Sequence, residues 1–450
     1  MHPVVSKTLT IVAVVAPLCL DASEDWLSWR GEGNRGVSET AEPPLTWSET
    51  SNIDWKVPIE GEGTSSPIVV GDRVFITTAR DTGEIHPDLP RPEDQPERVF
   101  GITFPNTHYE MILLCIDRGS GKTLWRRVAK TLIPHEGHHR DASFASGSPV
   151  SDGENVYCWF GSAGCFAFDL DGNLLWERNL GEARMGASLG EGSSPVVHQG
   201  KVVLVRDHAG QSRISVLDAN DGSILWQRDR DEENAWATPV IAQFGGRTQV
   251  ITSATNRVRA YDLASGEVIW HAGGLTHNCA PCPILDGEMV YLMSGYRGHA
   301  LLAIPISGQG DVTDQIQWRT TKGTPYVPSA MLVDGRLFFT RSNQGILSCL
   351  AARTGKPIIE RQRIEGLGDL YASPVGAAGR VYLIGRRGSA VVLSDGGPLD
   401  QLATNRLADQ FHASPALSGD RLLLRGMRFL YCLRQGGTFS SNPSAIQLSG

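Results

Sequence analysis

The stretch PVVHQGKVVLV, residues 195–205, follows Ser194 and places two β-rich runs on either side of a polar turn. This pattern predicts a strand, a tight turn and a second strand. The same start, or a close variant of it, occurs eight times in the chain, as Ser66-Pro67, Ser148-Pro149, Ser194-Pro195, Thr238-Pro239, Cys282-Pro283, Ser329-Ala330, Ser373-Pro374 and Ser414-Pro415. From the second copy onward the copies lie about 41 to 47 residues apart, which is the period of propeller blades.

A second pattern continues each unit with a third strand, a turn that carries Asp and Gly, and a fourth strand that often opens with Trp. CIDRGSGKTLW (115–125) and VLDANDGSILW (216–226) are two examples. The Asp side chain can accept backbone N–H groups in the turn, and Gly takes the positive φ that the reversal needs. A Trp at a fixed radius can fill the space between neighbouring blades. We therefore expect a structural role for Trp125, Trp176, Trp226, Trp270 and Trp318.

The last unit, residues 414–437, supplies three strands and lacks a fourth. The missing strand has a counterpart at the other end of the chain, in IDWKVPIEGEGTSSP (53–67), where Trp55 stands just before the first Ser-Pro. We expect this N-terminal strand to complete the last blade, because closure removes exposed sheet edges. The sequence thus predicts an all-β fold, an eight-bladed β-propeller of four-stranded antiparallel blades.

Composition supports a turn-rich β protein and excludes one class of partner. The 450 residues include 50 Gly and 25 Pro, and no long stretch has helical periodicity. The net charge of −8 comes without any run of Lys or Arg. Because binding to nucleic acid needs a basic footprint, we expect no nucleic-acid partner.

The ends of the chain differ in character from the repeats. Residues 1–22 have a weakly basic start, an apolar stretch and a small residue, Ala22, at which a peptidase could cut. These features predict a signal peptide or an uncleaved N-terminal anchor, so we expect an exported protein of the periplasm or cell envelope. Membrane association would then involve the N-terminus only. The remaining divisions are an N-terminal extension (23–52), the propeller (53–438) and a C-terminal tail (439–450).

The residues three places before each Pro should enter the central channel from one face. Some of these residues have ring side chains, and a Tyr stands one place before Val327 in the sixth unit. Together these rings predict a ligand-binding funnel at the channel mouth. The members of this funnel are Trp236, Tyr326, Tyr371 and His412. The alternative is that these rings pack against neighbouring loops and close the channel.

The first unit contains two enlarged loops, within residues 79–111 and 129–146. By propeller geometry both kinds of loop emerge on the same face, so we expect them to meet beside the funnel. Rigid scaffolds commonly carry their functional residues on such loops.

The second enlarged loop contains a dense group of metal-binding residue types, His135, Glu136, His138 and His139. Imidazoles at this density predict a site for zinc or another transition metal. The spacing is not that of a zinc-protease helix, however, and Gly137 disfavours a helix at this point. These two features favour a solvated polar loop over a metal site at these residues.

The repeats taken together resemble the pyrroloquinoline-quinone-like (PQQ-like) β-propeller family over about residues 50–435. This family includes eight-bladed quinoprotein alcohol dehydrogenases and non-catalytic relatives such as the lipoprotein of the β-barrel assembly machinery. WRGEGNRGVS (29–38) and HASPALSGDRLLLRG (412–426) look closer still to exported bacterial PQQ-binding-like propeller proteins. The resemblance implies the propeller fold and leaves two kinds of function open.

The dehydrogenases of the family hold their quinone against two adjacent cysteines and bind calcium with Glu, Asn and Asp side chains. This chain has no adjacent cysteine pair, and those ligands have no matching positions. We therefore expect an exported, non-catalytic scaffold without a cofactor, which binds a protein, peptide or glycan partner at the cell envelope. The alternative is a PQQ- and calcium-dependent dehydrogenase of alcohols or sugars. A third hypothesis is a metal-dependent activity at His135–His139.

Overall fold

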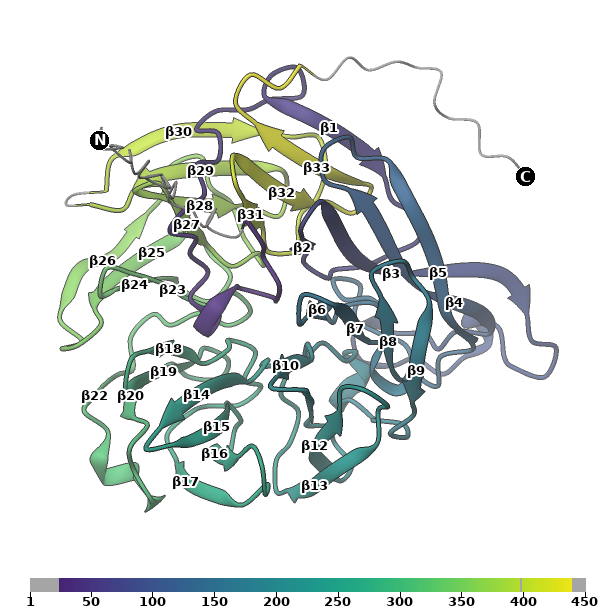
Figure 1. Ribbon diagram of the computed structural model, residues 1–450, viewed down its shortest axis with the longest axis horizontal. Helices are drawn as coiled ribbons and strands as arrows, with labels where there is room; N and C mark the ends of the chain where they lie inside the picture. The colour runs from purple at the N-terminus through teal and green to yellow at the C-terminus, as the bar shows by residue number, and fades with distance from the viewer. Residues whose placement is uncertain (1–23, 397–398, 439–450) are drawn as a thin grey trace, which may run out of the picture.

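Eight β-sheets surround a central channel in the computed structural model, which describes residues 24–396 and 399–438 (Figure 1). The eight-bladed propeller predicted from the repeats is confirmed, and every copy of the Ser-Pro dipeptide or its variant stands just before the first strand of a blade. The signal peptide or anchor expected at 1–22 and the tail expected at 439–450 lie outside the described residues. Among those residues no helix is long and apolar enough to cross a membrane.

Each blade is built on four strands that follow one another in the chain, except the eighth, whose fourth strand comes from the N-terminal end of the chain. The strands of the first four blades are β2 (Ile68–Val70), β3 (Arg73–Ile85), β4 (Thr107–Asp117) and β5 (Thr123–Leu132); β6 (Val150–Ser151), β7 (Asn155–Trp159), β8 (Cys165–Asp169) and β9 (Leu174–Arg178); β10 (Val196–His198), β11 (Lys201–Arg206), β12 (Ser212–Asp218) and β13 (Ile224–Arg230); and β14 (Val240–Phe244), β15 (Arg247–Thr252), β16 (Val258–Asp262) and β17 (Val268–Ala272).

The second half of the ring repeats this order and ends with the closing blade. Its strands are β18 (Ile284–Asp286), β19 (Met289–Ser294), β20 (Ala300–Pro305) and β22 (Trp318–Thr320); β23 (Met331–Val333), β24 (Arg336–Thr340), β25 (Ile346–Ala351) and β26 (Pro357–Arg363); β27 (Val375–Ala377), β28 (Arg380–Ile384), β29 (Ser389–Ser394) and β30 (Gln401–Arg406); and β31 (Ala416–Ser418), β32 (Arg421–Arg425), β33 (Phe429–Arg434) and β1 (Ile53–Pro58). Short 3₁₀ segments are η1 (Glu32–Asn34), η2 (Pro92–Asp94), η3 (Val99–Gly101), η4 (Gly161–Ala163), η5 (Gly186–Ser188) and η6 (Thr313–Gln315).

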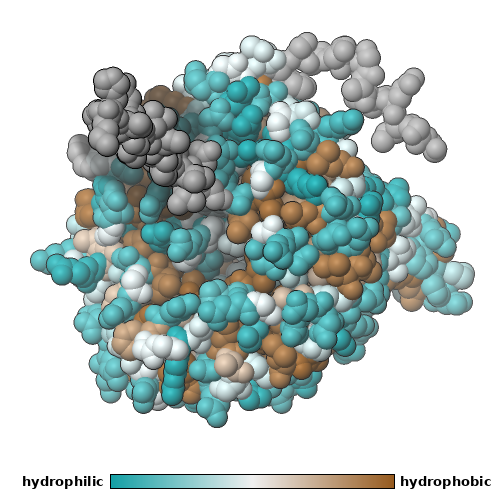
Figure 2. Space-filling model, in the orientation of Figure 1, coloured by the Kyte–Doolittle hydropathy of each residue, from teal (hydrophilic) through white to brown (hydrophobic). Residues whose placement is uncertain are grey.

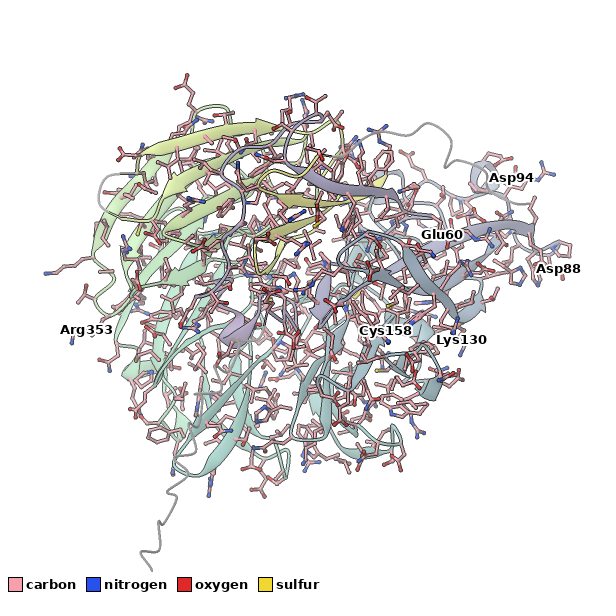
Figure 3. All side chains as sticks on the ribbon, turned by 45° about the horizontal axis from the view of Figure 1, so that its top comes forward. Glu60, Asp88, Asp94, Lys130, Cys158 and Arg353 are labelled. Carbon is pink, nitrogen blue, oxygen red and sulfur yellow. The ribbon has the colours of Figure 1, made fainter. Side chains whose placement is uncertain are left out.

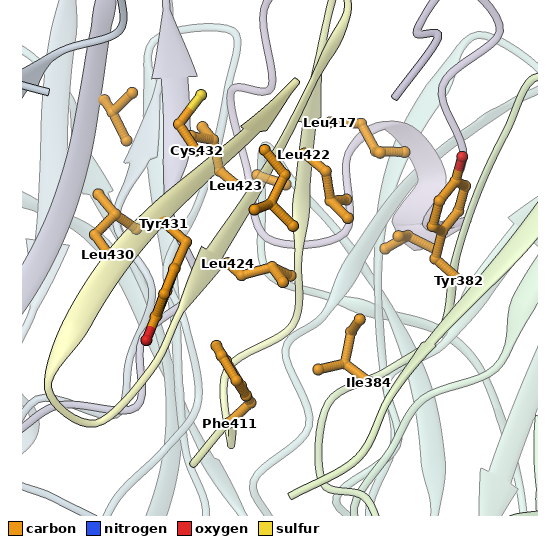
Figure 4. Packing of buried hydrophobic residues seen from close by; sticks show 14 of the residues in the cluster. Tyr382, Ile384, Phe411, Leu417, Leu422, Leu423, Leu424, Leu430, Tyr431 and Cys432 are labelled. Carbon is orange, nitrogen blue, oxygen red and sulfur yellow. The ribbon is translucent and has the colours of Figure 1, made fainter. Parts of the chain in front are cut away.

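The N-terminal strand completes the last blade, as the sequence predicted. Strand β1 pairs antiparallel with β33, so that Trp55 lies opposite Cys432. Figure 4 shows the leucines of β31 and β32 packed beside β33, with Tyr382 and Ile384 of the preceding blade nearby. The two ends of the described chain thus share one hydrophobic cluster, and burial of its apolar side chains holds the ring closed.

The tryptophans pack between blades through one repeated contact. The Trp125 indole N–H donates to the carbonyl of Leu170 in the next blade (3.0 Å), and a Cβ on Gly172 would lie 2.8 Å from the Trp125 ring. Gly172 also has a φ of +83°, so this turn needs glycine for two reasons. The same pairing of an indole with a turn glycine recurs at Trp55 and Gly121, Trp176 and Gly222, Trp226 and Gly266, and Trp318 and Gly355.

Trp270 departs from this arrangement, although its role is structural as expected. Its indole N–H donates to Oε1 of Gln249 in its own blade (3.0 Å). The segment after β20 packs against it with the buried side chains of Ile306 and Val312 and adds a short parallel strand, β21 (Gly310–Asp311), beside β17. This blade therefore has five strands where the sequence predicted four.

The N-terminal extension runs along one face of the ring before it enters β1. Trp26 pairs with Val69 of the first blade, and Val37 pairs with Gly376 of the seventh. On this face, which Figure 2 shows, hydrophilic and hydrophobic residues alternate in small patches. Strands β3 and β4 extend beyond the disc, and Figure 3 shows Asp88 and Asp94 on the loop that joins them.

Candidate functional site

A closed ring of hydrogen bonds surrounds the channel. The residue before each blade's first Pro, or before Ala330, donates its backbone N–H to the side chain of the corresponding residue in the next blade. The donor and acceptor pairs are Ser66 to Ser148, Ser148 to Ser194, Ser194 to Thr238, Thr238 to Cys282, Cys282 to Ser329, Ser329 to Ser373, Ser373 to Ser414 and Ser414 to Ser66. All eight distances are 2.9 or 3.0 Å. The repeat therefore requires a small side chain with an acceptor atom, which Thr and Cys also provide.

The N-terminal extension closes one end of this channel with residues 26–38, the N-terminal plug, whose η1 lies at the centre of the ring in Figure 1. The Arg30 guanidinium is buried and donates to the carbonyls of Pro374 (2.5 Å) and Ala330. Burial lowers the pKa of Arg30 to about 9, so its charge remains at neutral pH. Asn34 donates to two further carbonyls in the fourth and fifth blades. The plug thus satisfies carbonyl groups from four consecutive blades, the fourth to the seventh.

The other end of the channel opens into a cavity of about 380 Å³, which is within the size range of ligand sites. We call it the aromatic cavity, because five aromatic side chains line it. They are Phe100, Trp236, Tyr296, Tyr326 and Tyr371. The structure therefore brings together three of the four residues that the sequence placed in the funnel, and leaves space between them. His412 lines the narrower channel below the cavity, which has a volume of about 160 Å³.

The aromatic cavity has one wall of stacked rings. The centroids of Tyr296 and Tyr326 are 5.0 Å apart with 25° between the ring planes. Trp236 also lines the cavity, and its indole N–H donates to the carbonyl of Gly190 (2.7 Å). Fixed rings of this kind offer apolar faces to a ligand at little cost in side-chain entropy.

A charged network separates the aromatic cavity from its surroundings. Asp141 accepts hydrogen bonds from the Tyr371 hydroxyl (3.0 Å) and from the Arg386 guanidinium. Arg386 also lies over the Tyr371 ring, 4.1 Å from its centroid. Burial, reinforced by Asp141, raises the pKa of Tyr371 to about 12. Burial lowers the pKa of His412, as does the nearby Arg386. At neutral pH the phenol and the imidazole are both uncharged.

The first two candidate metal ligands turn away from the aromatic cavity. His135 Nε2 lies 3.0 Å from the carbonyl of Ala183, and Glu136 accepts the N–H of Met185 (3.0 Å). Burial raises the pKa of Glu136. Both side chains border a separate space of about 50 Å³ together with Glu191.

The other two candidate ligands also have their own contacts. His138 packs edge-on against Phe144, with ring centroids 4.5 Å apart, and His139 contacts Phe100 in the same way at 5.3 Å. In the part of the chain that the structure describes, no group of three or more His, Cys, Asp or Glu side chains is placed to hold a metal ion. The structure therefore does not bring His135, Glu136, His138 and His139 to one point.

The contact between Phe100 and His139 joins the two enlarged loops beside the aromatic cavity, where the sequence placed them. Phe100 has a φ of +61°, which is strained for a bulky residue. Phe100 is 67% exposed, and the adjacent Val99 is 58% exposed. A strained and exposed aromatic residue at the rim of a cavity is typical of a binding surface.

The cavity residues do not fit a quinone with calcium. Calcium needs about six or more oxygen donors, whereas the carboxylates at the described cavity wall are Asp141 and Glu191. Asp141 is held by Arg386, and Glu191 Oε1 accepts the N–H and the hydroxyl of Ser162 (both 2.7 Å). The cysteines that the structure describes are buried and unpaired, and Cys282 is part of the hydrogen-bond ring.

Several residues of this site have only weak signals in the sequence. Phe100 and Asp141 lie in the two enlarged loops, so their position was predictable although their roles were not. Arg386 is one of two consecutive arginines in the turn after β28, and this pair is the signal that could have pointed to it. Tyr296 follows β19 without any pattern that marks it.

The comparison with sequence families decides the relationship. The profile described as outer membrane protein assembly factor BamB matches residues 110–360, more than half of the chain. The chain belongs to this PQQ-like propeller family. A search of curated proteins finds no match to this BamB-like propeller.

Solved structures share the fold of the BamB-like propeller. BamB from Moraxella catarrhalis aligns with a TM-score of 0.58 and 14% identity, over 86% of this chain and 98% of that one. Quinohemoprotein alcohol dehydrogenase from Comamonas testosteroni aligns with a TM-score of 0.64 and 11% identity, over 93% of this chain and 81% of the enzyme. The computationally designed protein Ika8 aligns with a TM-score of 0.51 and 11% identity, over 76% and 97%. At these identities the likeness establishes the fold alone.

Proposed function

We propose that this protein is an exported, non-catalytic scaffold of the cell envelope, which binds a polypeptide partner through the aromatic cavity. The family model that matches the chain is named after an outer membrane protein assembly factor. The start of the sequence has the pattern of an export signal. Both observations support a location in the periplasm or at the outer membrane.

The observation that carries the proposal is the aromatic cavity itself. Its volume of about 380 Å³ suits one or two large apolar side chains of a bound segment. Phe100 at the rim and the stacked pair of Tyr296 and Tyr326 on the wall present aromatic faces to such side chains. Aromatic anchors in a pocket commonly provide most of the energy of peptide binding.

The dehydrogenase alternative lacks a comparable observation. The carboxylates of Asp141 and Glu191 are engaged by neighbouring groups, and the lining residues that the structure describes offer no set of oxygens that would hold calcium beside a quinone. The test is direct, since a quinoprotein purified with quinone and calcium would oxidise alcohols or sugars with a dye acceptor. Such turnover would overturn the scaffold proposal.

Peptide display against the purified protein tests the positive claim. We expect the selected peptides to contain aromatic or large aliphatic residues, and to bind about tenfold more weakly after Tyr326→Ala, since one lost aromatic contact costs about 1.5 kcal/mol. Leu225→Ala is the matched control, because Leu225 is 46% exposed on the outer strand of its blade. Equal binding by both variants would contradict the proposal, as would selective retention of glycans instead of peptides.

A further inference from the structure

A second and larger hollow lies beside the aromatic cavity, with a volume of about 1020 Å³. The seventh and eighth blades and the second enlarged loop contribute its walls. Its charged lining residues are Arg140, Asp141, Asp369, Arg386, Arg387, Arg406, Asp409 and Arg428. We call this space the arginine groove. It concentrates five arginines against three aspartates in a chain whose net charge is −8.

Two of the three aspartates are already neutralised within the protein. Asp141 pairs with Arg386 and accepts the Tyr371 hydroxyl. Asp409 is 1% exposed at its side chain, accepts the N–H of Phe429 (3.1 Å), and lies 3.6 Å from the Arg428 guanidinium. These carboxylates therefore serve the fold and offer little negative potential to the groove.

Three of the arginines have no such partner. The side chains of Arg140, Arg387 and Arg406 are exposed and make no hydrogen bond or ion pair with any residue that the structure describes. They come from three separate segments of the chain, namely the second enlarged loop, the turn after β28 and the end of β30. The exposed Asp369 is the only acid near them among the described lining residues that lacks a charged partner. The groove therefore has an excess of positive charge.

Unpaired arginines in a cleft attract anions, because the walls focus the field and each guanidinium can donate two parallel hydrogen bonds to a carboxylate. The volume of about 1020 Å³ is far larger than a single small anion needs. Asp369 and Gln410 add acceptors to the lining, which suit the N–H groups of a polypeptide and disfavour a purely phosphate ligand.

We propose that the arginine groove binds an acidic polypeptide segment of a partner protein. The site is distinct from the aromatic cavity and does not depend on it, although Asp141 lines both spaces. A partner that occupies both would place apolar side chains in one space and Glu or Asp side chains in the other.

The test measures binding of a fluorescein-labelled, glutamate-rich peptide without aromatic residues, by fluorescence anisotropy with the full folded protein. We expect binding that weakens as salt is added. The triple variant Arg140→Gln, Arg387→Gln, Arg406→Gln should bind about tenfold more weakly, the combined effect of three exposed charge pairs. Its unfolding midpoint should match that of the wild type, because none of the three side chains has a described partner.

A matched control separates the groove from the overall charge. The triple variant Arg247→Gln, Arg319→Gln, Arg353→Gln removes the same charge from exposed arginines on other blades, and Figure 3 shows Arg353 at the rim of the disc. It should bind the peptide as the wild type does. Equal losses in both triple variants, or no binding by the wild type, would overturn the proposal. So would binding to phosphatidylglycerol vesicles but not to the peptide, which would assign the groove to phosphate headgroups. The peptide lacks aromatic residues, so either result leaves the aromatic cavity to its own test.

Discussion

The two ends of the channel differ in how far their groups are already bound by other parts of the same chain. At one end the N-terminal plug places Arg30 and Asn34 against four carbonyl groups from four blades, and the side chain of Arg30 is buried. At the other end Tyr326 and Phe100 present ring faces to an open cavity. The difference indicates that the plugged end stabilises the ring and that the open end is available to a partner.

The largest effect should come from emptying the plugged end. Arg30→Ala leaves the carbonyls of Pro374 and Ala330 without their donor and creates a cavity, so we expect a loss of about 3 kcal/mol in the free energy of unfolding. Urea unfolding followed by tryptophan fluorescence measures it. Arg353→Ala, an exposed substitution, serves as the control. An unchanged midpoint for Arg30→Ala would mean that the plug does not support the ring.

At the open end the same measurement should give a smaller value. Tyr326→Ala removes a partly buried ring that stacks on Tyr296, and we expect it to cost about 1 kcal/mol of stability while it weakens peptide binding. A loss of stability as large as that of Arg30→Ala would abolish the contrast between the two ends.

A pH titration sharpens the comparison at the cavity wall. Burial raises the pKa of Glu191, so between the usual glutamate pKa and this raised value the folded state holds a proton that the unfolded chain has released. Stability must therefore fall as the pH rises through that window. Glu191→Gln should reduce this fall, whereas Glu154→Gln, at an exposed residue, should not. If the stability of the wild type and of Glu191→Gln changed equally with pH, the raised pKa of Glu191 would be contradicted.

The smallest effect concerns the hydrogen-bond ring that separates the two ends. Cys282→Ser keeps an acceptor for the N–H of Thr238 and should change the free energy of unfolding by less than about 0.5 kcal/mol. Cys282→Val removes that acceptor and should cost about 1 kcal/mol. If both substitutions cost the same, the side chain at this position would act through its volume and not through the hydrogen bond.

The sequence was sufficient for the parts of the fold that repeat. The Ser-Pro period predicted eight blades, and the missing last strand predicted the pairing of β1 with β33, because both follow from counting equivalent units. The gathering of Trp236, Tyr326 and Tyr371 followed from their equivalent places in the repeat. The sequence did not predict that a side chain and a backbone N–H of each repeat would form a closed ring, since hydrogen-bond partners in different blades have no pattern along the chain.

The parts that do not repeat were harder to predict. Arg30 bonds to backbone carbonyls, which every residue possesses, so no sequence signal marks its partners. The pair of Asp141 and Arg386 and the arginine groove join segments that are more than two hundred residues apart. The fifth strand β21 arises from an insertion that packs on the preceding blade through Val312, which the period alone could not reveal.

The pairing of β1 with β33 also sets the order in which the protein can be completed. The first described strand, β1, has its partner in Phe429–Arg434, and the plug has partners as late as Gly376. The ring therefore cannot close until nearly the whole polypeptide has been synthesised. A product that stops before Phe429 leaves β32 with an unpaired edge and β1 without its partner, and an exposed edge can pair with other chains. The architecture thus makes protection against aggregation depend on full-length translation.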